Sequence, residues 1–362
     1  MTEEEGRRSP LYDWHIAAGA EIIWDDGWPW AMNVGGDELS EYEAIRTGTG
    51  LWDLYSTCKY EITGPDATRL IQRRFTNDLA PMGIGAVRYG AFVNADGLMV
   101  DEGNVYKHAD ERYWVMINRG DLADWLRETA DGLDASVEHA TERLPMTAVQ
   151  GPTSRDVLQG LTDADLSPLK YFRCWPDPVK VAGVDAWIQR TGYSGEIGYE
   201  VVTDVAGALP VWEALVVAGG KPFGLEAIDI ARIEAGLLVM AVDYESGETS
   251  PFDVSLDKFI KPGTECVGAA ALAAVASDPP KRLTTLQIES DAAAEAGVEV
   301  TRDGEVVGSV TSPTVSPRLG TIALAILETD AAIDGGKVEI GGAVATVAPL
   351  SLYDLEKKKP RG

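Results

Sequence analysis

Two acid-rich stretches of the sequence carry residue types suited to proton chemistry and to the binding of a planar heterocycle. The first, VNADGLMVDEGNVY, places Asp101 and Glu102 side by side just after a glycine turn. The second, RTGYSGEIGYE from Arg190 to Glu200, combines three glycines with two tyrosines and two glutamates. Paired carboxylate oxygens accept parallel N–H donors, and flat aromatic faces suit a ring-shaped ligand.

The acidic pair has two readings. Neighbouring residues of a strand point to opposite faces, so one carboxylate of Asp101 and Glu102 can enter a cleft while the other meets solvent. The alternative is a solvated surface, where adjacent acids are common.

The glycine-rich stretch also has two readings. Its glycines recur at every third position, which suits a strand, a tight turn and a returning strand, and lets a ligand approach the backbone closely. In the alternative reading it is only a hairpin with an acidic rim. Trp28 and Trp30 in DDGWPWAMN can line an apolar pocket or belong to the core.

Several kinds of chemistry are not indicated. The sequence contains no GxGxxG, P-loop, GxSxG or HExxH motif. Its three cysteines lie far apart and it has only three histidines, so we expect neither a disulfide framework nor a metal site. Carboxylates and tyrosines are the residues left for proton transfer.

The elements that must position these residues follow from periodicity and turn signals. We expect helices over 35–48, with Asp37 or Ser40 as the cap, and over 66–78, 119–133 and 224–239. A strand pair is expected over 51–64. Short strands dominate after Arg282, with a hairpin turn at Asp303 and Gly304, which favours a small antiparallel barrel or sandwich. Residues 355–362 are expected to be a frayed tail.

Length and charge set the class of protein. At 362 residues we expect two or three domains. The net charge of −27 repels phosphate, so nucleic acid and anionic membrane surfaces are poor partners. No apolar run approaches the roughly 18 residues that span a bilayer. These features predict a cytoplasmic protein, and the charge favours a high-salt, halophilic cytoplasm in which ions screen self-repulsion.

Seven stretches, collinear over nearly the whole chain, resemble the glycine-cleavage T-protein family, the folate-dependent aminomethyltransferases and their demethylase relatives. They are SPLYDWH, GPDATRLIQRRFTNDLA, RYGAFVNADG, VQGP, RTGYSGEIGYE, ARIEAGLL and SPRLGTIALAIL. The resemblance implies an α+β fold of three domains in a ring around a central folate site, with a small C-terminal antiparallel β-barrel. We therefore expect a discontinuous first domain at 1–49 and 141–262, a second at 50–140 and a barrel at 280–355.

The resemblance also implies tetrahydrofolate as cofactor and assigns residues to it. Glu200 would bind the amino-pyrimidine edge of the pterin. The family's catalytic carboxylate occupies the second position of the acidic pair, here Glu102, with Asp101 as the alternative. The remaining folate-site residues that we expect are Tyr89, Asn118, Tyr171, Tyr193 and Arg190.

The implied reaction moves an aminomethyl or methyl group from a small donor, or from a lipoylated carrier protein, to N5 of tetrahydrofolate. The chain departs from T-proteins at Ile228, where they carry arginine, and in WDLYSTC, where they read FDVSHM. Similar departures occur in demethylases of sulfonium, ammonium or aryl methyl ether substrates, for which Trp28 and Trp30 would offer cation–π faces. A non-catalytic folate-binding protein is a second alternative, although no KGCYxGQE-like motif surrounds any cysteine.

Overall fold

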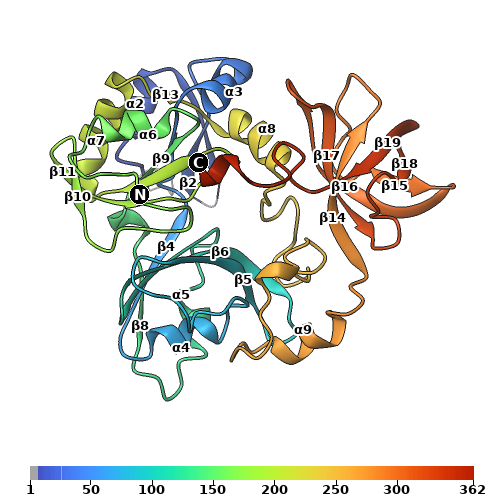
Figure 1. The fold of residues 1–362 in the computed structure, drawn as a ribbon, viewed down its shortest axis with the longest axis horizontal. Coiled ribbons are helices and arrows are strands. Elements are labelled where there is room, and N and C mark those ends of the chain that lie inside the picture. Colours follow the sequence, from blue (N-terminus) through green and yellow to red (C-terminus); the bar gives the residue numbers. More distant parts are fainter. Residues whose placement is uncertain (1–6, 26) are drawn as a thin grey trace.

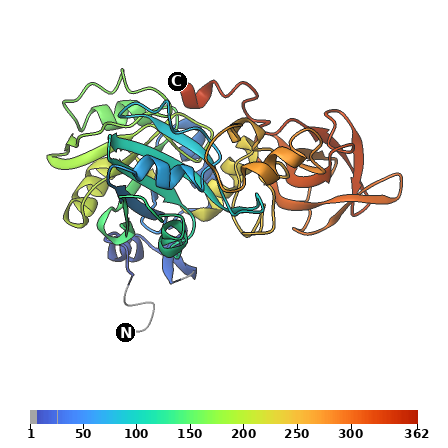
Figure 2. The ribbon, with the colours of Figure 1, turned by 90° about the horizontal axis from the view of Figure 1, so that it is seen from below.

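The computed structural model describes residues 7–25 and 27–362, which form three bodies arranged around a common centre (Figure 1). Two bodies are built on open sheets and the third is a barrel. The same ribbon viewed from below shows the barrel projecting to one side of the two sheet-based bodies (Figure 2). This mixed α and β architecture with a C-terminal antiparallel barrel confirms the expected fold class.

The first body is a six-stranded sheet flanked by helices. Its strands in spatial order are β10 (Val179–Val181), β11 (Val184–Gln189), β12 (Gly198–Val202), β9 (Met146–Gln150), β3 (Gly50–Asp53) and β13 (Lys221–Pro222). Its helices and the additional hairpin are α2 (Tyr12–Ala17), β1 (Ala20–Asp25), β2 (Trp28–Val34), α3 (Glu38–Thr47), α6 (Ser154–Gln159), α7 (Val205–Val217) and α8 (Leu225–Ala235).

The second body is an antiparallel five-stranded sheet with two short helices. Its strands in spatial order are β5 (Val87–Val93), β6 (Met99–Ala109), β7 (Arg112–Ile117), β4 (Cys58–Thr63) and β8 (Ser136–His139). The helices are α4 (Ala67–Gln72) and α5 (Ala123–Arg127). Helix α5 is shorter than the range 119–133 that we expected. At the start of that range, the backbone N–H of Arg119 donates to Asp101, so this residue lies outside the helix.

The third body is a closed antiparallel barrel. It contains β14 (Lys281–Ile288), β17 (Gly320–Glu328), β16 (Glu305–Ser316), β15 (Glu299–Arg302), β18 (Lys337–Ile340) and β19 (Ala343–Ala348). Asp303 and Gly304 both have positive φ, 55° and 84°, and join β15 to β16, which confirms the predicted hairpin. The short elements η1 (Thr141–Arg143), η2 (Asp257–Phe259), α9 (Ala269–Val275) and η3 (Lys359–Arg361) lie outside the sheets.

The strand pair expected over 51–64 is wrong in one respect. Both strands form, but β3 pairs with β9 in the first sheet, whereas β4 pairs with β7 and β8 in the second. Alternating apolar residues identify a strand and its buried face, but they do not identify the neighbouring strand. The chain therefore passes between the two bodies after Asp53, a few residues beyond the domain limit that we proposed.

A buried ion pair within the first body also contacts the barrel. Asp37 caps α3 by accepting from the Ser40 backbone, and this helix carries Arg46 to a site beneath α8. The Arg46 guanidinium binds Glu234 of α8 at 2.6 Å, and both side chains are 0% exposed. Glu234 also accepts the Tyr42 hydroxyl at 2.6 Å and the Ser316 hydroxyl of β16. One carboxylate thus joins three elements.

Replacement of Glu234 with alanine is expected to lower the free energy of unfolding by about 3 kcal/mol, because buried Arg46 would lose its closest counter-ion and keep the more distant Glu196 at 3.5 Å. Urea unfolding at fixed salt measures this change. Glu43 is the control, since it pairs with Arg318 of the same barrel at 2.6 Å but is 46% exposed. Glu43→Ala is expected to cost at most about 1 kcal/mol. Equal losses in the two variants would contradict the role assigned to burial.

No helix among the described residues is long and apolar enough to cross a membrane.

Candidate functional site

One face of β6 carries polar side chains toward the first body. Glu102, Asn104 and Tyr106 occupy alternate positions of this strand, and residues two apart share a face. Tyr106 lies in the buried cluster between the two sheets, whereas Val105 on the opposite face lies in the core of the second body. These three polar residues therefore line one side of the buried interface between the two sheets, which we call the gap.

Asp101 and Glu102 point to opposite faces of β6, as strand geometry requires, but neither side chain faces solvent as expected. Asp101 is 0% exposed and Glu102 is 8% exposed. Asp101 accepts hydrogen bonds from the backbone N–H groups of Glu102 at 2.7 Å and Arg119 at 2.8 Å. It also accepts from the side chain of Asn118 at 2.7 Å. Asp101 therefore holds the end of β7 against β6, and its oxygens are occupied by the protein.

Glu102 has fewer donors and an unusual acidity. Its Oε1 accepts from Asn118 Nδ2 at 3.3 Å, and Tyr89 on the neighbouring strand also hydrogen-bonds to it. Burial first, and then the charge of Asp101, raises the pKa of Glu102 to about 7, while the hydrogen bonds from Tyr89 and Asn118 oppose the rise. A carboxyl with this pKa gives up and takes up protons near neutral pH. The structure thus brings Glu102, Tyr89 and Asn118 together.

Glu200 lies on β12 and faces the same gap from the first body. Its Oε2 accepts hydroxyl hydrogens from Thr191 at 2.5 Å and from Tyr106 at 3.1 Å. Within the described part of the chain, Oε1 accepts no hydrogen bond. Burial is the main reason that the pKa of Glu200 is raised. The bond from Tyr106 spans the two sheets, so Glu200 and the polar face of β6 border one space.

The glycines of the loop between β11 and β12 permit contacts within the protein. Gly195 has φ of 76°, and a Cβ there would lie 2.7 Å from the Ala235 side chain. A Cβ at Gly198 would lie 2.4 Å from the amide of Gln150. Gln150 in turn holds the loop by accepting from Ser194 at 2.8 Å. The close approach that these glycines allow in the structure is made by Gln150 and Ala235.

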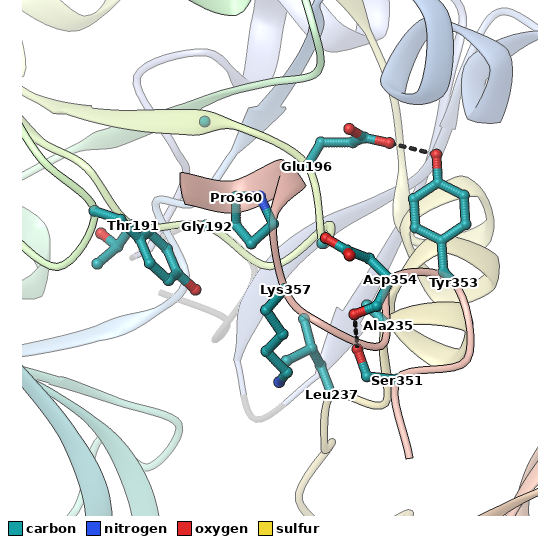
Figure 3. A pocket seen from close by; sticks show the side chains of 13 residues that line it. Thr191, Gly192, Glu196, Ala235, Leu237, Ser351, Tyr353, Asp354, Lys357 and Pro360 are labelled. Atoms are coloured by element: carbon teal, nitrogen blue, oxygen red, sulfur yellow. Dashed lines mark hydrogen bonds between the residues drawn. The ribbon is translucent and has the colours of Figure 1, made fainter. Parts of the chain in front are cut away.

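A small cavity of about 30 Å³ lies between this loop and the C-terminal segment (Figure 3). Thr191 lines it from the loop, and Tyr353, Lys357 and Pro360 line it from the C-terminal segment. Tyr171 is another of its lining residues. Burial raises the pKa of Tyr171 to about 12.

The C-terminal segment is docked, so the expectation of a frayed tail is wrong. Arg190 is 1% exposed, and its Nη2 donates to the carbonyls of Pro360 at 3.2 Å and Arg361 at 2.9 Å. Glu196 accepts from Tyr353 at 2.6 Å and from Lys359 at 3.4 Å. The structure thus places Arg190 against the tail, away from the oxygens of Glu200. Local composition could not indicate this, because the partners lie far away in the sequence.

Tyr193 and Trp30 both lie beside the ring of Trp52. The ring of Trp52 lies 6.3 Å from that of Tyr193 and 6.0 Å from that of Trp30. The Tyr193 hydroxyl donates to the carbonyl of Leu238. Trp28 is buried against Tyr55, and the guanidinium of Arg7 lies over its ring at 5.0 Å. The two tryptophans therefore pack against different aromatic rings.

Sequence reasoning missed three residues that contact the acids. Tyr106 follows Glu102 by four positions on one strand, so alternation could have indicated it. Thr191 lies inside the glycine-rich stretch beside Arg190. The Tyr244 hydroxyl lies 3.5 Å from Asp101 and had no local signal. Together the site offers the Oε1 acceptor of Glu200 and a proton-exchanging carboxyl at Glu102, separated by polar side chains of β6.

Most of the chain is similar to known proteins. The family model described as the GCVT N-terminal domain matches residues 11–264, and the glycine cleavage T-protein C-terminal barrel domain matches residues 281–354. An aminomethyltransferase of Streptomyces avermitilis is 36% identical, covering 92% of this chain and 93% of the relative. A probable aminomethyltransferase of Natronomonas pharaonis is 36% identical over 87% of this chain and 88% of the relative.

The fold is also similar to a solved structure. The glycine cleavage system aminomethyltransferase T of Bartonella henselae superposes with a TM-score of 0.87 at 24% sequence identity. The match covers 96% of this chain and 98% of that chain, so the three-body arrangement is shared throughout.

Proposed function

Because this chain belongs to the glycine cleavage T-protein family, we propose that it is a tetrahydrofolate-dependent aminomethyltransferase. The observation that carries the residue assignment is the pair of carboxylates bordering one gap, Glu200 from the first sheet and Glu102 from the second. Both carboxylates are buried. Glu102 has a pKa of about 7, whereas Glu200 is held by two hydroxyl donors.

Tetrahydrofolate, when bound, supplies the N5 nitrogen that receives the one-carbon unit. The residues fit such a ligand because Glu200 keeps one oxygen without a protein donor, and a buried carboxylate favours N–H partners. Thr191 and Tyr106 orient Glu200 through its other oxygen. Tyr171 and Thr191 line the same cavity, which supports a role for Tyr171 near the Glu200 end of the folate site.

Glu102 takes the role of the catalytic carboxyl in this proposal. Its pKa of about 7 allows it to hold or release a proton at neutral pH, whereas Asp101 is saturated by protein donors. Asn118 and Tyr89 orient Glu102 through hydrogen bonds. Asp101 is a positioning residue that holds Asn118 and raises the pKa of Glu102 by its charge.

The aminomethyl donor is proposed to be carried by a lipoylated carrier protein, and the cytoplasm of a high-salt organism is the proposed compartment. The charge of −27 supports the second point, and Natronomonas pharaonis and Haloarcula marismortui are among the organisms with relatives. Demethylation of a sulfonium, ammonium or aryl methyl ether is not favoured, because the relatives compared are aminomethyltransferases. Trp28 gives no support to a cationic substrate, because the guanidinium of Arg7 already lies over its ring.

The purified protein in molar salt, incubated with tetrahydrofolate and an aminomethyl-loaded lipoylated carrier, is expected to yield methylene-tetrahydrofolate. Mass spectrometry of the folate measures the product. The carrier without its aminomethyl group serves as the control. Methyl-tetrahydrofolate formed from a methylated metabolite would instead identify a demethylase. Folate that binds but returns unchanged in the loaded reaction would favour the non-catalytic alternative.

A further inference from the structure

Asn104 is a polar residue of the gap whose carboxamide oxygen has no partner. It lies on β6 between Glu102 and Tyr106, opposite Tyr89 of β5 and Met116 of β7. The residue as a whole is half-buried, but its Oδ1 is buried and accepts no hydrogen bond from the described part of the chain. The carboxamide oxygen of Asn104 is thus buried without a hydrogen-bond donor from the described residues.

Such an atom requires an explanation. Buried side-chain oxygens of native proteins nearly always have a donor, and one left without a donor costs stability comparable with a lost hydrogen bond. Glu102 and Tyr106, on the same face of this strand, both have hydrogen-bond partners within the protein. A group outside the polypeptide is therefore expected to supply the donor.

The facing sheet has unused polar atoms as well. Gln189 of β11 is 0% exposed, and neither its oxygen nor its nitrogen has a partner among the described residues. It is the register partner of Glu200, so both side chains lie on the same face of the sheet. The indole N–H of Trp187, two residues earlier on that face, also has no partner within residues 7–25 and 27–362. Both facing sheets thus carry buried polar atoms without a partner in the described part of the chain.

The position of Asn104 on β6 limits which ligand group could donate a hydrogen bond to it. It lies between Glu102, assigned to N5, and Tyr106, which contacts the carboxylate assigned to the pyrimidine edge. With N5 at Glu102, the pyrazine half of tetrahydrofolate would lie beside this part of β6, and N8–H would be the ring donor that Glu102 leaves free. The nitrogens of this half, N5 and N8, both carry hydrogen in tetrahydrofolate, and neither does in folic acid.

We propose that Asn104 accepts an N–H of the reduced pyrazine ring and thereby makes the site selective for reduced folate. This inference rests on the proposed function. A site built to bond a substrate N–H rejects an analogue without it, because the acceptor then remains buried and unpaired.

Asn104→Leu, which keeps the side-chain size, tests the proposal by calorimetric titration with tetrahydrofolate and with folic acid in molar salt. Loss of one buried hydrogen bond is expected to weaken tetrahydrofolate binding by about tenfold and to change folic acid binding by less than about threefold. The melting temperature of the ligand-free variant is expected not to fall, because an unpaired polar atom has been removed.

Asn77→Leu is the matched control for stability. Asn77 is also buried, but its amide donates to Tyr89 at 2.8 Å and its oxygen accepts from Asp78 at 2.9 Å, so this variant is expected to melt earlier. Unchanged tetrahydrofolate affinity in Asn104→Leu would overturn the proposal, as would equal weakening of both ligands. A parent protein that binds neither folate overturns the proposed function, and the role of Asn104 with it.

Discussion

Glu102→Gln is expected to lower the turnover number by about 10²- to 10⁴-fold, the usual contribution of a positioned proton-transfer group. Glutamine keeps the length and the hydrogen bond from Asn118 but cannot exchange a proton. Tetrahydrofolate affinity is expected to stay within a few-fold, because the assigned binding carboxylate is Glu200. Steady-state rates and calorimetric titration separate the two effects.

The comparison with Asp101→Asn decides which acid does the chemistry. Asp101 accepts backbone N–H groups at 2.7 and 2.8 Å, so its replacement is expected to lower the melting temperature. It also removes a charge that raises the pKa of Glu102, so the acid limb of the rate profile is expected to move to lower pH. A folded Asp101→Asn protein without activity, beside an active Glu102→Gln protein, would reverse the assignment.

The pH dependence of the parent follows from the same carboxyl. With Glu102 acting in its ionised form, kcat/KM is expected to fall about tenfold per pH unit below about 7 and to level off above it. A carboxyl whose pKa is raised on folding binds more protons in the folded state. Its ionisation therefore costs stability as pH rises from the ordinary value of 4.5 through about 7. Glu102→Gln removes this cost and is expected to be the more stable protein at pH 8.

Glu200→Gln is expected to weaken tetrahydrofolate binding by about 100-fold, because the neutral amide loses the negative charge that strengthens hydrogen bonds from the ring N–H groups. The measurement is the dissociation constant from calorimetric titration in molar salt. Thr191→Val and Tyr106→Phe remove the two donors that orient Glu200, and each is expected to have a smaller effect of about three- to tenfold. Binding by Glu200→Gln equal to that of the parent would exclude Glu200 from the folate contact.

Part of the site was predictable because it depends on local geometry. Alternation along a strand places Asp101 and Glu102 on opposite faces, and the structure has them so. The Asp303 and Gly304 hairpin and the Asp37 cap were likewise predictable, since a turn and a cap involve residues only a few positions apart.

The environment of the same residues was decided by tertiary structure. Whether Asp101 meets solvent depends on the end of β7, which supplies the Arg119 backbone donor. Whether Arg190 faces a ligand or the tail depends on Pro360 and Arg361, 170 residues further along the chain. Composition predicts fraying for a charged tail because it counts the residues themselves and not the distant acceptors and donors that they meet.

The sequence by itself determined the family, the strand and helix types, and the two acidic stretches, because these follow from motif order, hydrophobic period and turn residues. Only the tertiary structure decided which strands pair, that Glu102 and Glu200 border one gap, and that the Asn104 Oδ1 on the same strand as Glu102 is buried without a donor among the described residues. The physical reason is that pKa, burial and hydrogen-bond satisfaction depend on what is nearby in space. For this site, those neighbours come from two different sheets.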